Sequence, residues 1–452
     1  MSVVGSILLR PNARRVAWLL VAGLLCLGPS RAAAQALPQE AAPAVEPQHD
    51  AAADPHAGHN MAQMDALFPG RTGSGTSWLP QRTTMVGTHL QAGPWTVMLM
   101  GNGFVQYLSE VAPLHRGADQ AGSINWLMLM GRRQAGAGWA GLRAMVSAEP
   151  FTIGGCGYPN LLATGERCDG DTIHDRQHQH DLFMELAAEY DRPVGKGLRW
   201  HVYGGPVGEP ALGPVAFPHR QSALLNPLAP IAHHWLDATH ITFGVITSGL
   251  SGQRWRAEAS AFNGREPDEQ RTDFDLGAPD SFSARFAFHA TDVLAVQVSA
   301  GRLESAEPSE GGRPPVDVAR ITASMLYQGT LAARPLTATL AWGSNHERGA
   351  RTHAALAEAT LALTPRHNLF GRAEVAGKTA HDLHAHHEPD ATVLTVGKFQ
   401  GGYVRLFAPR RRVQAGLGGS LSAALIPATI RPNYGGVGVG FGLFAVLRPV
   451  AP

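Results

Sequence analysis

A strict alternation of polar and apolar residues runs through most of the chain from residue 96 onward. It is clearest in Arg254–Ala261 (RWRAEASA), Ser281–Phe286 (SFSARF) and Leu336–Leu340 (LTATL). Successive side chains of a strand point to opposite faces, so this pattern predicts half-buried β-strands. After the first 34 residues we find no helical period of useful length and no apolar run long enough for a transmembrane helix. The sequence therefore predicts an all-β protein.

About sixteen segments share this alternation, and most run roughly ten residues, the length of a tilted strand that crosses an outer membrane. Their predicted starts lie near Thr96, Ser123, Gly138, Asp181, Leu198, Thr239, Arg254, Ser281, Val293, Asp317, Leu336, His353, Asn368, Ala391, Arg412 and Gly436.

The connections between these segments alternate between short and long. The long ones are Ser109–Gly122, Phe151–His180, Val207–Ala238, Gly264–Asp280, Ser305–Val316, Ser344–Thr352, Thr379–Asp390 and Leu425–Gly435. Transmembrane barrels have short periplasmic turns and long extracellular loops. The predicted fold is an antiparallel transmembrane β-barrel of about 16 strands, with long extracellular loops folded inward, in the outer membrane of a Gram-negative bacterium.

Tryptophans support this orientation. Trp95, Trp139, Trp200 and Trp255 lie at or near the start of upward strands. This placement predicts an aromatic girdle at the periplasmic interface.

The first 94 residues differ from the rest. Arg10, Arg14 and Arg15 precede an apolar stretch at 16–27, and Ala32–Ala34 supplies an A-x-A cleavage site. Residues 1–34 are therefore predicted to be a signal peptide. Residues 35–94, rich in Ala, Pro and Gln, are predicted to be a flexible periplasmic arm, and residues 95–452 the barrel.

Two cysteines remain after the signal, Cys156 and Cys168. Export favours a disulfide between them, which would close a small loop. Two free thiols are the alternative.

Histidines concentrate in the long loops. Imidazole with a carboxylate suits zinc, copper(II) or nickel, which makes these loops candidate metal sites. The alternative is a hydrogen-bonded network of His, Asp and Arg that plugs the barrel without metal, because buried polar groups need partners. The candidate residues are His174, His178 and His180 in the second loop, His219, His233, His234, Asp237 and His240 in or just after the third, and His381, His384, His386 and His387 in the seventh.

The third long loop is rich in proline and apolar residues. Leu224, Leu228, Ile231 and Trp235 argue against disorder. A loop of this length in a compact protein is usually functional, and we expect it to fold into the lumen or over the mouth of the barrel.

The arm carries a second candidate metal site. Mixed imidazole and thioether ligands suit copper, whereas a low-complexity tail is the alternative. The candidate ligands are His49, His56, His59, Met61 and Met64.

Enzymatic and nucleic-acid functions have little support. The formal net charge is +1, with no basic face or tail. The chain has no G-x-S-x-G, H-E-x-x-H or P-loop motif. A Ser222–His219 pair in an outer-membrane hydrolase remains an alternative that spacing alone does not establish.

Several segments resemble a family of uncharacterised bacterial outer-membrane barrel proteins. They are Gly73–Pro80, Gly122–Met128, Gly155–Glu166, Asp175–Leu186 (DRQHQHDLFMEL), Gly208–Arg220 and Asn226–Val245. The family pattern reads DRQHPHD, and this chain has Gln179 in place of the proline. The resemblance implies an outer-membrane location and no mechanism. The arm is also similar, in composition only, to arms of outer-membrane copper-resistance proteins.

The sequence thus predicts a passive channel or binding protein connected with copper or another transition metal such as zinc. Membrane lipid and the metal ion are the expected partners, and an oligomeric state is left open. Two other classes compete with this prediction: a barrel enzyme acting on lipid or envelope substrates, and a plugged structural barrel.

Overall fold

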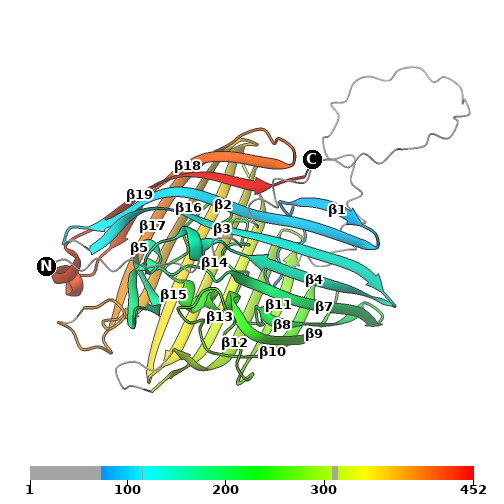
Figure 1. Cartoon of the computed structure of the whole chain (residues 1–452), viewed down its shortest axis with the longest axis horizontal. Coiled ribbons are helices and arrows are strands. Elements are labelled where there is room, and N and C mark those ends of the chain that lie inside the picture. The colour runs from blue at the N-terminus through cyan, green and yellow to red at the C-terminus, as the bar shows by residue number, and fades with distance from the viewer. Residues whose placement is uncertain (1–72, 115, 308–313, 386, 452) are drawn as a thin grey trace, which may run out of the picture. The chain divides into compact units, whose positions relative to one another are not determined.

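The computed structural model describes residues 73–114, 116–307, 314–385 and 387–451. Sixteen antiparallel strands close into a barrel, because β19 pairs with β2 through Val439 and Val111 (Figure 1). The strands are β2 (Trp95–Ala112), β3 (Arg116–Ala135), β4 (Gly138–Val146), β7 (Phe183–Gly195), β8 (Leu198–Gly208), β9 (Thr242–Ser251), β10 (Trp255–Phe262), β11 (Ser281–Thr291), β12 (Leu294–Glu307), β13 (Val316–Leu331), β14 (Arg334–Glu347), β15 (Ala350–Thr364), β16 (His367–Thr379), β17 (Val393–Leu406), β18 (Val413–Leu425) and β19 (Gly438–Pro449).

The predicted fold class is confirmed, and all but one of these strands begin within three residues of the predicted starts. The exception is β3, which begins seven residues early, at Arg116. A short extra strand, β1 (Thr88–Ala92), forms a hairpin with β2. β1 pairs with Trp95–Leu99 of β2. The pairing of β19 with β2 ends at Gly103, before it reaches this segment.

The outer face of the barrel is apolar. In β11 exposed and buried residues alternate without a break from Ser281 to His289, and the exposed positions include Phe282 and Phe286. Leu421 on β18 and Val105 on β2 are 71% and 65% exposed. Because large apolar side chains point outward all round the barrel while charged ones point inward, the surface matches a hydrocarbon surrounding.

Two of the predicted long loops are wrong. Residues 109–122 form a hairpin in which β2 and β3 continue to Ala112 and Arg116. In residues 344–352, β14 continues to Glu347 and β15 begins at Ala350. The turn between them is Arg348 and Gly349, with φ of +45° and +77°, as a two-residue hairpin turn requires. Both segments were predicted as connections between the alternating segments, but the strand pairing continues through most of them.

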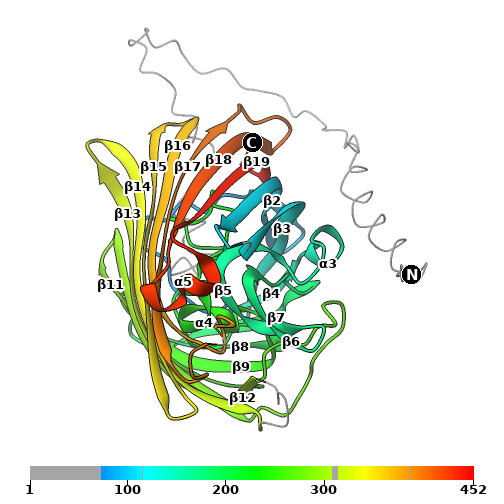
Figure 2. The same ribbon diagram turned by 90° about the vertical axis from the view of Figure 1, so that its left-hand side faces the viewer.

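The remaining loops contain short elements, and α4 and β5 are drawn inside the ring of strands in Figure 2. No helix among the described residues is long and apolar enough to cross a membrane. These elements are α3 (Glu149–Thr152), β5 (Tyr158–Cys168), β6 (Asp171–Gln177), α4 (His233–Leu236), η1 (Ala238–His240), η2 (Ala428–Ile430) and α5 (Arg431–Tyr434).

Residues that precede β2 in the chain also pack with the barrel. Residues 73–80, which we call the strap, are all buried, and β1 follows at residue 88. Composition suggested a continuous arm because the strap has no alternating pattern. Its burial comes from contacts with residues far along the chain.

Candidate functional site

The lumen is filled by the third long loop. We call residues 209–241 the plug; every one of them is buried except Gln221, His234 and Ala238, which are half-buried. The prediction that this loop folds inward is therefore confirmed. Its apolar residues pack in the interior, where Leu225 and Leu228 join Phe104 of β2 and Phe370 of β16 in one cluster.

Arg220 fixes the plug to the barrel wall. Its Nε donates to Glu358 Oε1 of β15 at 2.7 Å, and its Nη1 donates to Asp237 Oδ2 of the plug at 2.5 Å. Arg372 of β16 donates to the other oxygen of Glu358 at 2.9 Å. Arg220 is fully buried. Burial alone disfavours its charged form, but Glu358 and Asp237 outweigh that effect and raise the pKa of Arg220.

Further hydrogen bonds tie the plug to strands around the barrel. They include Asn226 Nδ2 to Gln400 Oε1 (2.7 Å), Arg372 to the Leu228 carbonyl (2.7 Å), Trp235 Nε1 to Thr352 Oγ1 (2.8 Å) and the Gly213 amide to Ser299 Oγ (2.8 Å). Because these partners lie on β12, β15, β16 and β17, the plug contacts a wide arc of the wall rather than one side.

The strap packs between the plug and the wall. The Ala216 amide of the plug donates to Ser74 Oγ at 2.8 Å, and Arg285 of β11 donates to Thr76 Oγ1 at 2.9 Å. Trp78 stacks on His289 with ring centroids 4.5 Å apart. Where the chain turns at Gly75, φ is +49° and a Cβ would lie 2.7 Å from Glu209, so glycine is required there.

A cavity of about 360 Å³ remains at the end of the barrel that carries the short turns. Its wall includes Arg132, Arg199, Arg256, Glu189 and Asp191. Asp191 accepts hydrogen bonds from both Arg132 and Arg199. The strap residues Thr76 and Trp78 also line this cavity, so the strap bounds the space below the plug.

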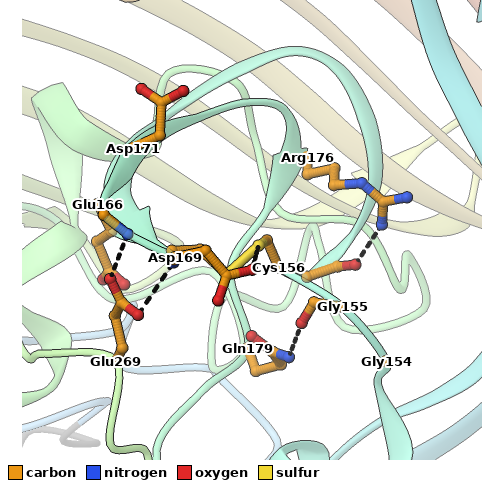
Figure 3. Close-up of a disulfide and its surroundings, with 12 residues drawn as sticks. Gly154, Gly155, Cys156, Glu166, Asp169, Asp171, Arg176, Gln179 and Glu269 are labelled. Carbon is orange, nitrogen blue, oxygen red and sulfur yellow. Dashed lines mark hydrogen bonds between the residues drawn. A yellow bond between two sulfur atoms is a disulfide. The ribbon is translucent and has the colours of Figure 1, made fainter. Parts of the chain in front are cut away.

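The predicted disulfide is confirmed. Cys156 and Cys168 are bonded, with Cα atoms 5.6 Å apart, next to the hairpin of β5 and β6 (Figure 3). Nearby, the Asp169 amide donates to Glu269 at 3.0 Å and Gln179 Nε2 donates to the Gly155 carbonyl at 2.9 Å (Figure 3). Asp175 of β6 accepts from Arg116 at 2.7 Å and from the Leu162 amide at 2.9 Å. The hairpin is therefore fixed to the barrel rim at several points.

Replacing both cysteines by serine should loosen the hairpin alone. The bridge joins residues 12 apart, and the loop-entropy model gives such a link about 3 kcal/mol. We expect amide exchange in residues 158–177 to become roughly a hundredfold faster, since 1.4 kcal/mol corresponds to a factor of ten. Hydrogen exchange by mass spectrometry measures this, with the amides of β9 and β10 as internal control. Unchanged exchange in the hairpin would show that its other contacts suffice.

Five of the predicted histidines form one cluster between the hairpin and the plug. Neighbouring ring centroids lie 5.2–6.0 Å apart along the series His178, His233, His240, His180, and His234 lies 5.3 Å from His233. Asp237, also predicted, accepts from His233 Nδ1 at 2.9 Å.

In each of these five rings Nδ1 faces an oxygen acceptor. His178 faces the Gln179 carbonyl, and His240 faces the Asp237 carbonyl. The other three face carboxylates: His180 faces Glu149, His233 faces Asp237 and His234 faces Glu266. Burial lowers the pKa of His178, His233 and His240. These three rings are therefore neutral at pH 7, with the proton on Nδ1.

The other candidate ligands lie apart from this cluster. His219 packs on Trp126 and approaches Met145 Sδ at 3.4 Å. The rings of His174 and His384 lie 3.9 Å apart, and His387 Nε2 lies 2.7 Å from the Thr429 carbonyl oxygen. His381 lines a separate cavity at the rim. His386, and the arm residues His49, His56, His59, Met61 and Met64, lie outside the described residues.

The histidine cluster is not arranged as a closed metal site. Among the described residues, groups of three ligand atoms within 4.8 Å of one another are Cys156, Cys168 and Asp169, and Asp268, Asp273 and Asp275. The first contains the disulfide and the second is a surface cluster, and neither includes a histidine. The contacts therefore favour the hydrogen-bonded network over direct coordination in the loops.

The Ser222–His219 pair does not form. Ser222 Oγ lies 2.7 Å from Thr339 Oγ1 and 3.0 Å from Glu358 Oε1. His219 faces Trp126 and Met145 instead. This plug serine therefore belongs to the polar network around Arg220.

Sequence reasoning missed the charged residues of the inner wall. Glu358 and Arg372 hold the plug, and Lys398 pairs with Glu110 and donates to Asn160 Oδ1 at 2.7 Å. A signal was present, since these charges lie within strands, on the face opposite the apolar positions. To predict which of these charged residues contact one another, the register of the strands and the path of the loops must be known.

No family model and no curated protein matches the chain. Among solved structures, it is similar to an anion-selective porin from Comamonas acidovorans (10% identity, TM-score 0.47, covering 78% of this chain and 99% of that one). It is also similar to Salmonella typhi OmpF in complex with daunomycin (10%, 0.47, 79% and 100%) and to the channel DcaP of Acinetobacter baumannii (11%, 0.44, 80% and 100%). Identities this low say nothing about solute or mechanism.

The closed sixteen-stranded barrel with its apolar outer belt has the architecture of a transmembrane β-barrel. The similarity of the arm to copper-resistance proteins has no support beyond composition.

Proposed function

We propose that this protein is a gated outer-membrane channel that the plug holds closed. The observation that carries the proposal is the burial of all but three half-buried residues of the plug inside a barrel whose strand number suits an aqueous lumen. Solute passage then requires the plug to leave part of the lumen. The polar inner wall, which includes Glu358, Arg372 and Lys398, would line the opened path.

The plug's bonding makes the closed state specific. Arg220 is held by two carboxylates, and several plug groups bond to the wall. A loop held by this many directional contacts has one well-defined position. Ion conductance in planar bilayers tests the proposal, with a quiet wild-type barrel and a conducting plug-deleted barrel as the expected pair.

A connection with a transition metal remains a prediction that rests on the arm. His49, His56, His59, Met61 and Met64 suit copper by ligand type, and they lie outside the described residues. We expect a chain lacking residues 49–64 to lose copper binding measured by calorimetry, while its barrel fold is unchanged. A chain with His178→Gln and His233→Gln is the matched control and should keep binding. Equal copper binding without residues 49–64 would exclude the arm as the site.

A further inference from the structure

The histidine cluster fills the seam between the β5–β6 hairpin and the plug. Two of its rings follow β6 in the chain, and three belong to the plug. Phe217 of the plug contacts the rings of His180, His233 and His240, with centroids 5.5–5.7 Å apart. Apart from the half-buried His234, all of these side chains are buried. The plug in this position therefore keeps solvent away from most of the cluster.

Four carboxylates contact the cluster: Glu149, Glu166, Asp237 and Glu266. Asp237 is already paired with Arg220, and Glu166 is paired with Arg271; both arginines are buried. Glu149 and Glu266 face other rings, those of His180 and His234. A proton added to His233 or His240 therefore creates a positive charge without an unpaired carboxylate in contact.

A second proton is costly on both of these plug histidines. The ring centroids of His233 and His240 lie 5.2 Å apart, so two protonated rings would repel each other. His240 Nε2 is buried and has no hydrogen-bond partner among the described residues, so a proton there would be a donor without an acceptor. Burial lowers the pKa of both rings below the ordinary value of histidine. Both rings are neutral at pH 7 while the plug is in place.

We propose that His233 and His240 form an acid-sensitive latch, because their protonation favours release of the plug from the hairpin. The plug movement is the one that opens the proposed gated channel, so this inference deepens that function and rests on it. In the released plug both rings are in water, where histidine takes up a proton below about pH 6.5. Falling pH therefore stabilises the released form, and it does not stabilise the closed form until the lowered pKa values are reached.

Two acids near the latch do not reverse this sign. Burial raises the pKa of Glu166 to about 8, so its carboxyl group can donate a proton to His178 Nε2, 3.1 Å away. When the two residues separate at pH 5.5, His178 keeps that proton, so the pair takes up none. Burial raises the pKa of Asp181 to about 6, but its ion pair is with Arg271, in the loop between β10 and β11 rather than in the plug. Release thus takes up two protons, one on each latch ring.

Thiol labelling of an Ala229→Cys variant measures release of the plug. Ala229 is buried in the plug, and its backbone bonds to Tyr158 and Asn160 of the hairpin. A water-soluble maleimide should therefore react there only when the plug is released. We expect the labelling rate, divided by that of the unfolded chain at the same pH, to rise about a hundredfold from pH 7.5 to 5.5, because each ring contributes a factor of about ten. Wild-type protein should show conductance steps at pH 5.5.

Histidine variants in the labelling background identify the groups that respond. His233→Gln plus His240→Gln should abolish the rise, and His240→Gln alone should leave about tenfold, because glutamine stays uncharged at both pH values. The matched control is His346→Gln plus His353→Gln, which removes two exposed histidines of β14 and β15. This control should keep the full hundredfold rise.

Three outcomes would overturn the latch. They are labelling that does not depend on pH, a full rise in the His233 and His240 variant, or an equal loss in the His346 and His353 control. The first needs no histidine variant, so it decides the matter even if the double variant does not fold. Acid-driven labelling with a plug-deleted barrel that stays silent would support the latch and reject the channel alone. Labelling independent of pH with a conducting plug-deleted barrel would reject the latch alone.

Discussion

Removing the plug should turn a silent barrel into a conducting one. We expect the wild-type protein to show no steps in planar bilayers at pH 7.5. A variant in which a short Gly/Ser linker replaces residues 210–240 should show discrete conductance steps. The physical reason is that a sixteen-stranded barrel encloses a lumen wide enough for water once its filling is removed. The inner wall is already polar, so water can replace the hydrogen bonds of the plug.

The matched control replaces residues 272–279 by the same kind of linker. This segment of the loop between β10 and β11 is exposed apart from the half-buried Asp275. This control variant should show no conductance steps, which would show that replacing a loop does not by itself make the barrel conduct. A wild type that already conducts, or a plug-deleted barrel that folds but stays silent, would contradict a plug-gated channel.

Arg220→Met should release the plug without removing it. The substitution leaves Asp237 without its cation and Glu358 with Arg372 alone, in a region that water does not reach. Breaking a buried pair by removing one partner costs about 3–5 kcal/mol. That cost corresponds to a shift of at least a hundredfold toward the open state, since 1.4 kcal/mol is a factor of ten. Open probability in single-channel recordings measures the shift.

Arg302→Met is the control for Arg220→Met. Arg302 pairs with Asp317 on exposed parts of β12 and β13, where solvent screens the interaction. It should behave as wild type. Asp237→Asn added to Arg220→Met should cost less than the sum of the two single changes, because it removes the carboxylate that was left unpaired. Closed channels in the Arg220→Met variant would show that the apolar contacts of the plug hold it without this ion pair.

The alternation of residues along the chain was sufficient to predict the barrel. In segments such as Ser281–Phe286, the order of polar and apolar residues alone predicts which side chains face the membrane and which face the lumen, because the side-chain period of a strand is two. Loop lengths predicted an orientation in the membrane, and the two cysteines that remain after the predicted signal peptide predicted the disulfide, which is confirmed. The pattern failed at 109–122 and 344–352, where the strands continue through residues predicted to be loops.

Which histidines meet was decided by the tertiary structure. His178 and His233 are 55 positions apart in the chain, and they come together because the hairpin and the plug both turn inward. His219, in the same loop as His233, faces Trp126 of β3 instead. Local spacing in IHDRQHQHD could suggest a metal site, but the direction of each ring nitrogen depends on partners such as Glu149 and Glu166, which the local sequence does not specify.

The sequence by itself determined the class of fold, the strand count, the disulfide and the inward path of the third loop. These follow from local periodicity, composition and length, which each segment carries alone. Only the tertiary structure decided that the plug is held through Arg220, Asp237 and Glu358, that the strap lies inside the barrel, and that carboxylates from five parts of the chain line one cavity at the barrel rim. Those features depend on distances between residues far apart in sequence, and strand register and loop packing set such distances.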